Sequence, residues 1–253
     1  MRTIFTLIAT AILLVNYAKA QETMYMYKLG YITDSVVISN IDSILFNRAP
    51  GKAMIADYDG NLYHTITIGT QEWFRENLKT TKLNDGTDIP KVQDNAPWAA
   101  LTTPGYSVYN DVFLTTSYGI HYNWYAVETY KLCPTGWHTA TFDEWETLNN
   151  FLGGSDVSGG KMKSVSGGPW YEGWDGPNTG NDNSSDFFGV AAGTRGIDGA
   201  FNDWGWASRL WTETEDPADP TKARFKMLHS TTANLWQGSE LKTAGYSVRC
   251  IKD

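Results

Sequence analysis

Hydrophobic and polar residues alternate over the stretch 24–46, which is also rich in β-branched and aromatic side chains. This pattern predicts short strands at 24–29, 32–38 and 43–46. The polar segment 47–52 contains Pro50 and Gly51 and has the composition of a linker. The chain therefore divides into an N-terminal β segment over 21–50 and a main domain over 51–253. Three short strands have little core of their own.

Strand patterns continue in the main domain. They predict strands at 62–68 and 71–74, joined by a turn at Gly69, and further strands at 188–192, 208–213, 223–229 and 245–251. The stretches 84–105 and 153–186 are dense in Gly, Asn, Asp and either Pro or Ser, which indicates loops. The main domain is thus predicted to combine short strands with long loops.

Two segments place apolar residues at helical spacing. The first is 118–129. The second begins at Thr141, where Thr-Phe-Asp-Glu predicts a capping box between Thr141 and Glu144. Gly153 and Gly154 then end this helix. Its apolar stripe consists of Phe142, Trp145, Leu148 and Leu152.

Residues 1–20 have the features of a secretory signal peptide. Arg2 gives a positive start, residues 4–15 are mostly apolar, and Ala18-Lys19-Ala20 forms a small-x-small cleavage site. We expect cleavage between Ala20 and Gln21 and a secreted, periplasmic or cell-surface protein. No later stretch reaches the ~18 apolar residues that a membrane-spanning helix needs.

Two cysteines, Cys133 and Cys250, follow the leader. In an oxidising compartment an even number of cysteines favours a disulfide. The bridge would close a loop of 250 − 133 = 117 residues. Two free buried thiols are the alternative.

The net charge of the chain limits the kinds of molecule that it is expected to bind. The 253-residue chain is 42% hydrophobic and carries 20 basic and 28 acidic residues, a net charge of −8. Without Arg2 and Lys19 of the leader the balance is 18 − 28 = −10. No cluster of Lys or Arg offsets this charge, which argues against nucleic acid and anionic membrane as partners.

The loop 178–186 is a candidate Ca²⁺ site. Clustered side-chain oxygens in a flexible loop suit this hard cation, but the spacing does not match an EF-hand. An ordinary loop built from Asx turns is the alternative. The candidate ligands are Asn178, Asn181, Asp182 and Asp186.

Several tryptophans lie in glycine-rich segments of the second half. Exposed aromatic residues on loops often contact sugars or anchor protein interfaces, whereas a loop-rich domain also needs large side chains to fill its core. The set consists of Trp170, Trp174, Trp204, Trp206, Trp211 and Trp236.

Catalytic motifs are harder to find. The four histidines are scattered and none forms an H-E-x-x-H signature, and there is no G-x-S-x-G elbow or phosphate-binding glycine loop. Loop carboxylates such as Asp175 or Asp203 are the remaining candidates for a hydrolase.

Several sequence blocks together resemble a known family. In chain order they are 57–63 (DYDGNLY), 71–74 (QEWF), 76–80 (ENLKT), 122–127 (YNWYAV), 132–138 (LCPTGWH) and 245–250 (GYSVRC). These blocks resemble the Fibrobacter succinogenes major paralogous domain, and the resemblance covers residues 54–253.

The resemblance implies an α+β, C-type-lectin-like fold of the variant found in formylglycine-generating enzymes. That fold has two helices, a small antiparallel sheet and long loops, and it brings the chain ends together. The last strand is then expected near the strand at 62–68. The related oxidases need paired active-site cysteines late in the domain, and only Cys250 lies late here.

Relatives of this fold display binding loops before the final strand. By analogy we expect contact residues between 202 and 241, namely Trp204, Trp206, Trp211, Arg224 and Trp236. The leading hypothesis is a secreted or cell-surface binding module without catalysis, for a glycan or an extracellular protein. The alternatives are a divergent oxidase or hydrolase on the same fold and a structural subunit of a surface assembly.

Overall fold

The computed structural model describes residues 23–28, 31–37, 54–109, 118–165 and 173–253, in two separate units that divide after Pro50. In the first unit, β1 (Thr23–Lys28) and β2 (Tyr31–Val37) form an antiparallel hairpin, in agreement with two of the predicted strands. The strand predicted at 43–46 and the signal peptide lie outside the described residues.

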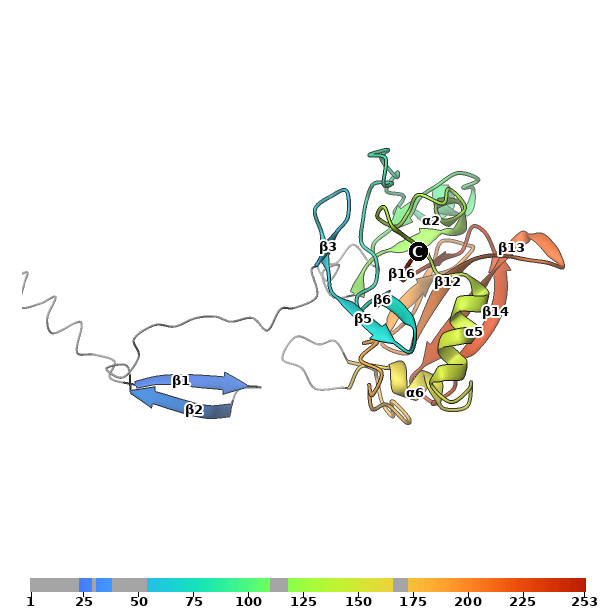
Figure 1. Cartoon of the computed structure of the whole chain (residues 1–253). Coiled ribbons are helices and arrows are strands. Elements are labelled where there is room, and N and C mark those ends of the chain that lie inside the picture. The colour runs from blue at the N-terminus through green and yellow to red at the C-terminus, as the bar shows by residue number, and fades with distance from the viewer. Residues whose placement is uncertain (1–22, 29–30, 38–53, 110–117, 166–172) are drawn as a thin grey trace, which may run out of the picture. The chain divides into compact units, whose positions relative to one another are not determined.

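The second unit is α+β and contains two main sheets (Figure 1). The large sheet has eight strands in the order β14-β13-β12-β10-β15-β8-β7, with β11 paired to β10. Its strands are β7 (Tyr106–Ser107), β8 (His121–Asn123), β10 (Ala192–Arg195), β11 (Phe201–Trp204), β12 (Ala207–Asp216), β13 (Asp219–His229), β14 (Trp236–Leu241) and β15 (Gly245–Tyr246).

The small sheet has four strands in the order β5-β6-β16-β9. It places the last strand of the chain beside strands from the start of the unit, as the resemblance led us to expect. The strands are β5 (Thr65–Ile68), β6 (Gln71–Phe74), β9 (Trp137–Thr139) and β16 (Cys250–Lys252), and a separate hairpin consists of β3 (Ile55–Ala56) and β4 (Leu62–Tyr63).

Four helices lie among the described residues, rather than the two predicted. The helix after Thr141 is confirmed with both halves of its capping box, and Figure 1 shows it lying along β12 to β14. Two of the others occur in stretches predicted as loops. The helices are α2 (Asn95–Ala99), α4 (Trp124–Val127), α5 (Phe142–Phe151) and α6 (Ser158–Met162).

The helix predicted over 118–129 is wrong in its first half. Residues 121–123 form β8, which pairs with β7 and β15, and all three are buried. The side chain of Asn123 then caps α4 by accepting from the Ala126 amide. The prediction failed because β8 is buried on both faces and leads directly into the short helix α4. Together the two elements place apolar residues at spacings that resemble those of one long helix.

Several predicted strands have different bounds. The strand at 62–68 is interrupted at His64, whose backbone N–H donates to the side chain of Glu76. The strand at 245–251 is divided into β15 and β16, because residues 247–249 cross between the two sheets and bond to Arg209, Leu78 and Ala140. The strand at 188–192 begins instead at Ala192, after Phe188 with its φ of 56°.

The two larger hydrophobic clusters lie on opposite faces of β12 and β13, and a third, small one contains Tyr118, Val190 and Ala192. Trp211 and Ala223 belong to the first cluster, which surrounds the buried cysteine pair. Leu210 and Leu228 belong to the second, which also contains Trp145 and Leu148 of α5. Alternate residues of these strands thus serve opposite cores, as the pleat of a strand requires.

Candidate functional site

The face of β12–β14 that points away from α5 is partly open. On the covered face, the Arg224 guanidinium lies 3.0 Å from the centroid of the Phe142 ring of α5. Neighbouring residues of a strand point to opposite faces, so Met227 of β13 lies on the other side. Met227 is paired with Arg209 of β12 and with Trp236 of β14.

These three residues form one row across three strands, which we call the Trp236 row. The Trp236 side chain is 51% exposed, Met227 is half-buried, and the Arg209 side chain is 28% exposed. A side chain at Gly238 would meet the Phe225 ring at 2.9 Å, so this glycine leaves room for the ring beside the row. The exposed indole of Trp236 at the end of this row is a surface on which a flat ligand ring can stack.

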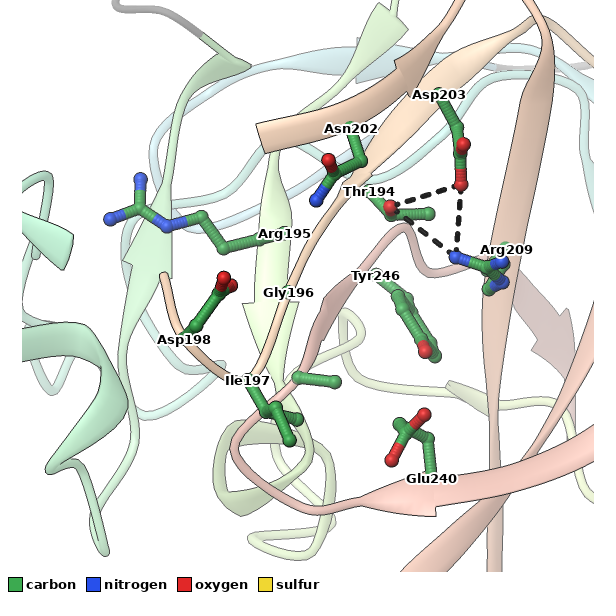
Figure 2. A pocket seen from close by; sticks show the side chains of 11 residues that line it. Thr194, Arg195, Gly196, Ile197, Asp198, Asn202, Asp203, Arg209, Glu240 and Tyr246 are labelled. Atoms are coloured by element: carbon green, nitrogen blue, oxygen red, sulfur yellow. Dashed lines mark hydrogen bonds and ion pairs between the residues drawn. The ribbon is translucent and has the colours of Figure 1, made fainter. Parts of the chain in front are cut away.

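A pocket of about 400 Å³ opens at one end of the row (Figure 2). Trp236 and Glu240 are four residues apart on β14, and so they share a face about 13 Å apart along the strand. Arg209 belongs both to the row and to the lining of the pocket, so we treat the two as one candidate site. The main side chains lining the pocket are Thr194, Asn202, Asp203, Arg209, Glu240 and Tyr246.

A tight hairpin between β10 and β11 builds one wall of the pocket. The Gly196 amide donates to the Ala200 carbonyl at 2.7 Å, and the Gly199 amide donates to the Gly196 carbonyl at 2.9 Å. Gly199 has a φ of +82°, and a Cβ there would meet the Asn95 backbone at 2.5 Å. Glycine at this position therefore permits both the turn and its contact with α2.

An ion pair organises the polar groups of the pocket. Arg209 Nη1 lies 3.1 Å from Asp203 Oδ2 and 3.3 Å from Thr194 Oγ1, the triangle drawn in Figure 2. The guanidinium carbon also lies 5.7 Å from the centroid of the Tyr246 ring. Burial raises the pKa of Tyr246 well above its ordinary value, so the phenol stays protonated at neutral pH.

The pocket therefore offers hydrogen-bond donors and acceptors next to apolar surface. Asn202 and Thr194 contribute neutral polar groups, and Glu240 contributes a carboxylate. Such a mixture suits a ligand rich in hydroxyl groups. Among the described residues, no group of three or more His, Cys, Asp or Glu side chains is placed to hold a metal ion.

The five predicted contact residues do not come together. Trp211 is 0% exposed and donates its indole N–H to the Tyr122 carbonyl, so its prediction as a contact residue is wrong. It lies on the same sheet face as Trp236 but in the middle of the sheet, where Tyr246 and Phe225 cover it. Arg224 lies on the opposite face, near a second cavity of about 310 Å³.

The remaining tryptophans differ in their exposure. Trp204 is half-buried, and the centroid of its ring lies 4.2 Å from that of the Tyr118 ring and 4.6 Å from that of the Tyr109 ring. Trp206 is 45% exposed and lies in the turn that leads into β12. Trp174 is buried in the second cluster, and Trp170 lies outside the described residues.

The four candidate Ca²⁺ ligands are engaged by the protein itself. Asn178 and Asn181 both donate to the Ser164 carbonyl, and Asp182 accepts from the Ser184 amide. Asp186 pairs with Arg75 at 2.8 Å. Of these contacts only that of Asp182 is an Asx turn, and the two asparagines use their amide nitrogens rather than their oxygens. The Ca²⁺ site therefore stays a prediction.

The predicted disulfide is confirmed. Cys133 and Cys250 are bonded, with Cα atoms 5.9 Å apart, and both residues are buried. Neither cysteine is a free thiol, so neither is available for the oxidase chemistry considered above as an alternative.

Sequence reasoning missed most of the pocket. Of its lining residues only Asp203 was a candidate, as a catalytic acid, and it is instead paired with Arg209. The others come from five strands between 192 and 246, and their proximity depends on strand register. The sequence signal closest to them is the turn Asp203-Trp-Gly-Trp206, which starts β12 beside the pocket.

Comparison with known proteins places the chain in a family. No curated protein and no solved structure matches it. No described helix is long and apolar enough to cross a membrane. The model of the Fibrobacter succinogenes major domain matches residues 66–252, well over half of the chain, and the protein belongs to this family.

Proposed function

We propose that this protein is a secreted or cell-surface binding module that acts without catalysis and binds a glycan at the Trp236 row and its pocket. The observation that carries the proposal is the exposed Trp236 indole on the same sheet face as a pocket of mixed polar groups. Sugar rings present an apolar face together with a rim of hydroxyl groups. The indole matches the face, and Asn202, Glu240 and the Arg209 pair match the rim.

The proposed location and fold rest on the sequence together with the architecture. A leader-like segment over 1–20 and two cysteines joined in a disulfide suit an oxidising compartment outside the cytoplasm. For the fold we propose the C-type-lectin-like type. The α+β architecture supports it, as does the small sheet, in which the last strand pairs with β6 from the beginning of the main unit.

The first experiment is a binding screen of the protein on a broad glycan array, with Ca²⁺ and then with a chelator. We expect saturable binding to a glycan. Binding that the chelator leaves unchanged would place affinity in the Trp236 row and pocket alone, and binding lost with the chelator would restore the 178–186 loop as a ligand site. A blank array for correctly folded protein would contradict the proposal.

Substitution of Trp236 tests the location of the site. We expect Trp236→Ala to weaken binding at least tenfold, equivalent to about 1.4 kcal/mol, because the stacking surface is lost. The matched control is Phe151→Ala, which removes a 64%-exposed aromatic side chain from α5, on the other face of the sheet. Equal affinities of the wild type and Trp236→Ala in isothermal titration calorimetry would exclude this row as the site.

A further inference from the structure

Arg195 of β10 lines the pocket, but its guanidinium points away from the pocket and lies against Trp98 of α2. Arg195 is 0% exposed, and its guanidinium carbon lies 4.1 Å from the centroid of the Phe201 ring and 5.0 Å from that of Trp98. Figure 2 shows the guanidinium pointing away from Tyr246 and Arg209. Its Nη2 donates to the Gln93 carbonyl at 2.7 Å. Its Nε and Nη1 have no hydrogen-bond partner among the described residues.

Two other buried cations show how this chain otherwise accommodates such charges. Arg249 makes four hydrogen bonds, one to the Asn77 side chain and three to backbone carbonyls. Lys163 donates to the three carbonyls of Thr179, His229 and Thr232. Arg195 makes one. A buried cation without such compensation is costly, because the hydration that it loses is not replaced.

Further polar atoms without partners occur on the same face of the large sheet as Arg195. Trp98 Nε1, Ser107 Oγ and His121 Nδ1 are buried and have no hydrogen-bond partner in the described part of the chain. Ser107 is paired with His121 across β7 and β8. Arg195 is paired with Gly245. We call Arg195, Trp98, Ser107 and His121 the Arg195 site.

The four residues of the Arg195 site share one face of the large sheet. Arg195 is paired with Gly245, and Gly245 is paired with Asn123, so these three residues face the same side. His121 is two residues before Asn123 on β8, and it therefore faces that side as well. Trp98 of α2 covers that side, since its Cζ2 would lie 2.7 Å from a Cβ at Gly245. Buried donors that lack partners in one region indicate an unseen occupant.

The four side chains of the Arg195 site together carry one positive charge. Burial lowers the pKa of Arg195 to about 10, which leaves it a cation at neutral pH. The nearby carboxylates of Asp94 and Asp198 favour the charged form, although neither pairs directly with the guanidinium in the described part of the chain. Burial lowers the pKa of His121 to about 4, so its ring is neutral. His121 Nε2 lies 3.1 Å from the Ala192 carbonyl oxygen and donates to it, which leaves Nδ1 as an acceptor.

We propose that the Arg195 site binds a small inorganic anion of the halide class, which serves as the counter-ion of Arg195. The free Nε and Nη1 of the guanidinium and the indole N–H of Trp98, whose ring lies 5.0 Å from the guanidinium carbon, would supply the donors. A monovalent anion suits a site closed to solvent better than a phosphate does, because it sheds its hydration shell more readily. Arg195 also lines the pocket, but its guanidinium points away from Arg209 and Tyr246, so an anion bound there does not require glycan binding.

The experiment compares thermal unfolding of the protein in sodium bromide, sodium chloride and sodium gluconate at matched ionic strength. We expect a halide-dependent rise in the unfolding temperature, of about 2–4 °C when the halide reaches roughly five times its dissociation constant. Anomalous scattering from a bromide-containing crystal should show the ion against Arg195 Nε or Nη1. Water alone at these atoms, with identical unfolding temperatures in the three salts, would overturn the proposal.

Two variants separate the site from general salt effects. Trp98→Phe keeps the ring and removes the indole N–H, and Arg195→Met removes the charge; both should lose the halide dependence. The matched control is Trp145→Phe, which removes another buried indole N–H without a partner from the second cluster. It should retain the halide response of the wild type. Full retention in Trp98→Phe and Arg195→Met would also contradict the assignment.

Discussion

His138 of β9 is held between carboxylates from two parts of the chain. Its Nδ1 lies 2.7 Å from Asp253 and its Nε2 lies 3.0 Å from Glu144 in the capping box. The hydrogen bond to Glu144 is the main cause that raises the pKa of His138 to about 9. Glu213 of β12 also faces this cluster, and burial raises its pKa to about 7.

The pKa shift of His138 makes stability depend on pH. A histidine with a folded-state pKa of about 9 and an unfolded value of 6.5 contributes fully below pH 6.5 and loses its contribution as the pH rises towards 9. We expect His138→Gln to remove most of this loss of stability between pH 6.5 and 9. The change in the free energy of unfolding should be on the order of 1 kcal/mol, a modest value because the ion pair is partly exposed to solvent. Urea unfolding at pH 6 and pH 9 measures the effect.

The matched control for this prediction is His229→Gln, since the His229 ring contacts Thr231 rather than a carboxylate. It should keep the pH dependence of the wild type. A His138→Gln variant whose stability falls between pH 6.5 and 9 as steeply as that of the wild type would contradict the role assigned to this histidine.

Among the elements, α5 is the one whose ends are specified most locally. The Thr141 hydroxyl accepts from the Glu144 amide at 3.3 Å, and the Glu144 carboxylate accepts from the Thr141 amide at 2.8 Å. Phe142, Trp145 and Leu148 then face the core. The segment 118–129 has similar apolar spacing without such a cap at its start, and its first half became a strand.

Loss of the cap should therefore destabilise the protein. We expect Thr141→Ala to lower the free energy of unfolding by about 1 kcal/mol, because the N-terminal amides of α5 lose an acceptor. Thr141→Ser should recover most of this loss. Thr147→Ala, at an exposed position of the same helix, should have little effect, and an equal loss in both alanine variants would show that the cap is not responsible.

At the scale of the molecule, the disulfide joins the segment before β9 to the last strand. These parts are 117 residues apart in the sequence and neighbours in the small sheet. Between them the chain forms α5 and most of the large sheet. The bridge thus restricts most of the main unit in the unfolded state.

We expect the double variant Cys133→Ala/Cys250→Ala to be less stable by about 4–5 kcal/mol in the chain-entropy model for a loop of this length. Denaturant unfolding of the oxidised protein measures the difference. Adding a reductant should destabilise the wild type and leave the double variant unchanged. Equal midpoints for the oxidised wild type and the double variant would show that the bridge adds no stability.

Sequence alone determined the features that depend on residues close together in the chain, and those for which only a few residues could pair. The capping box needs two residues three apart, and the strand at 71–74 and its turn need a few consecutive positions. The disulfide was predictable because the chain has two cysteines. The ordered sequence blocks identified the family, which the family model confirms.

Tertiary structure alone decided which tryptophans face solvent and which residues line the pocket. Trp211 and Trp236 both lie in strands of one sheet, yet one occupies its buried centre and the other its edge. Arg195 and Thr194 are adjacent in sequence and point to different sites. The reason is physical: burial at each position depends on the register between strands far apart in the chain, and no local pattern of residues specifies that register.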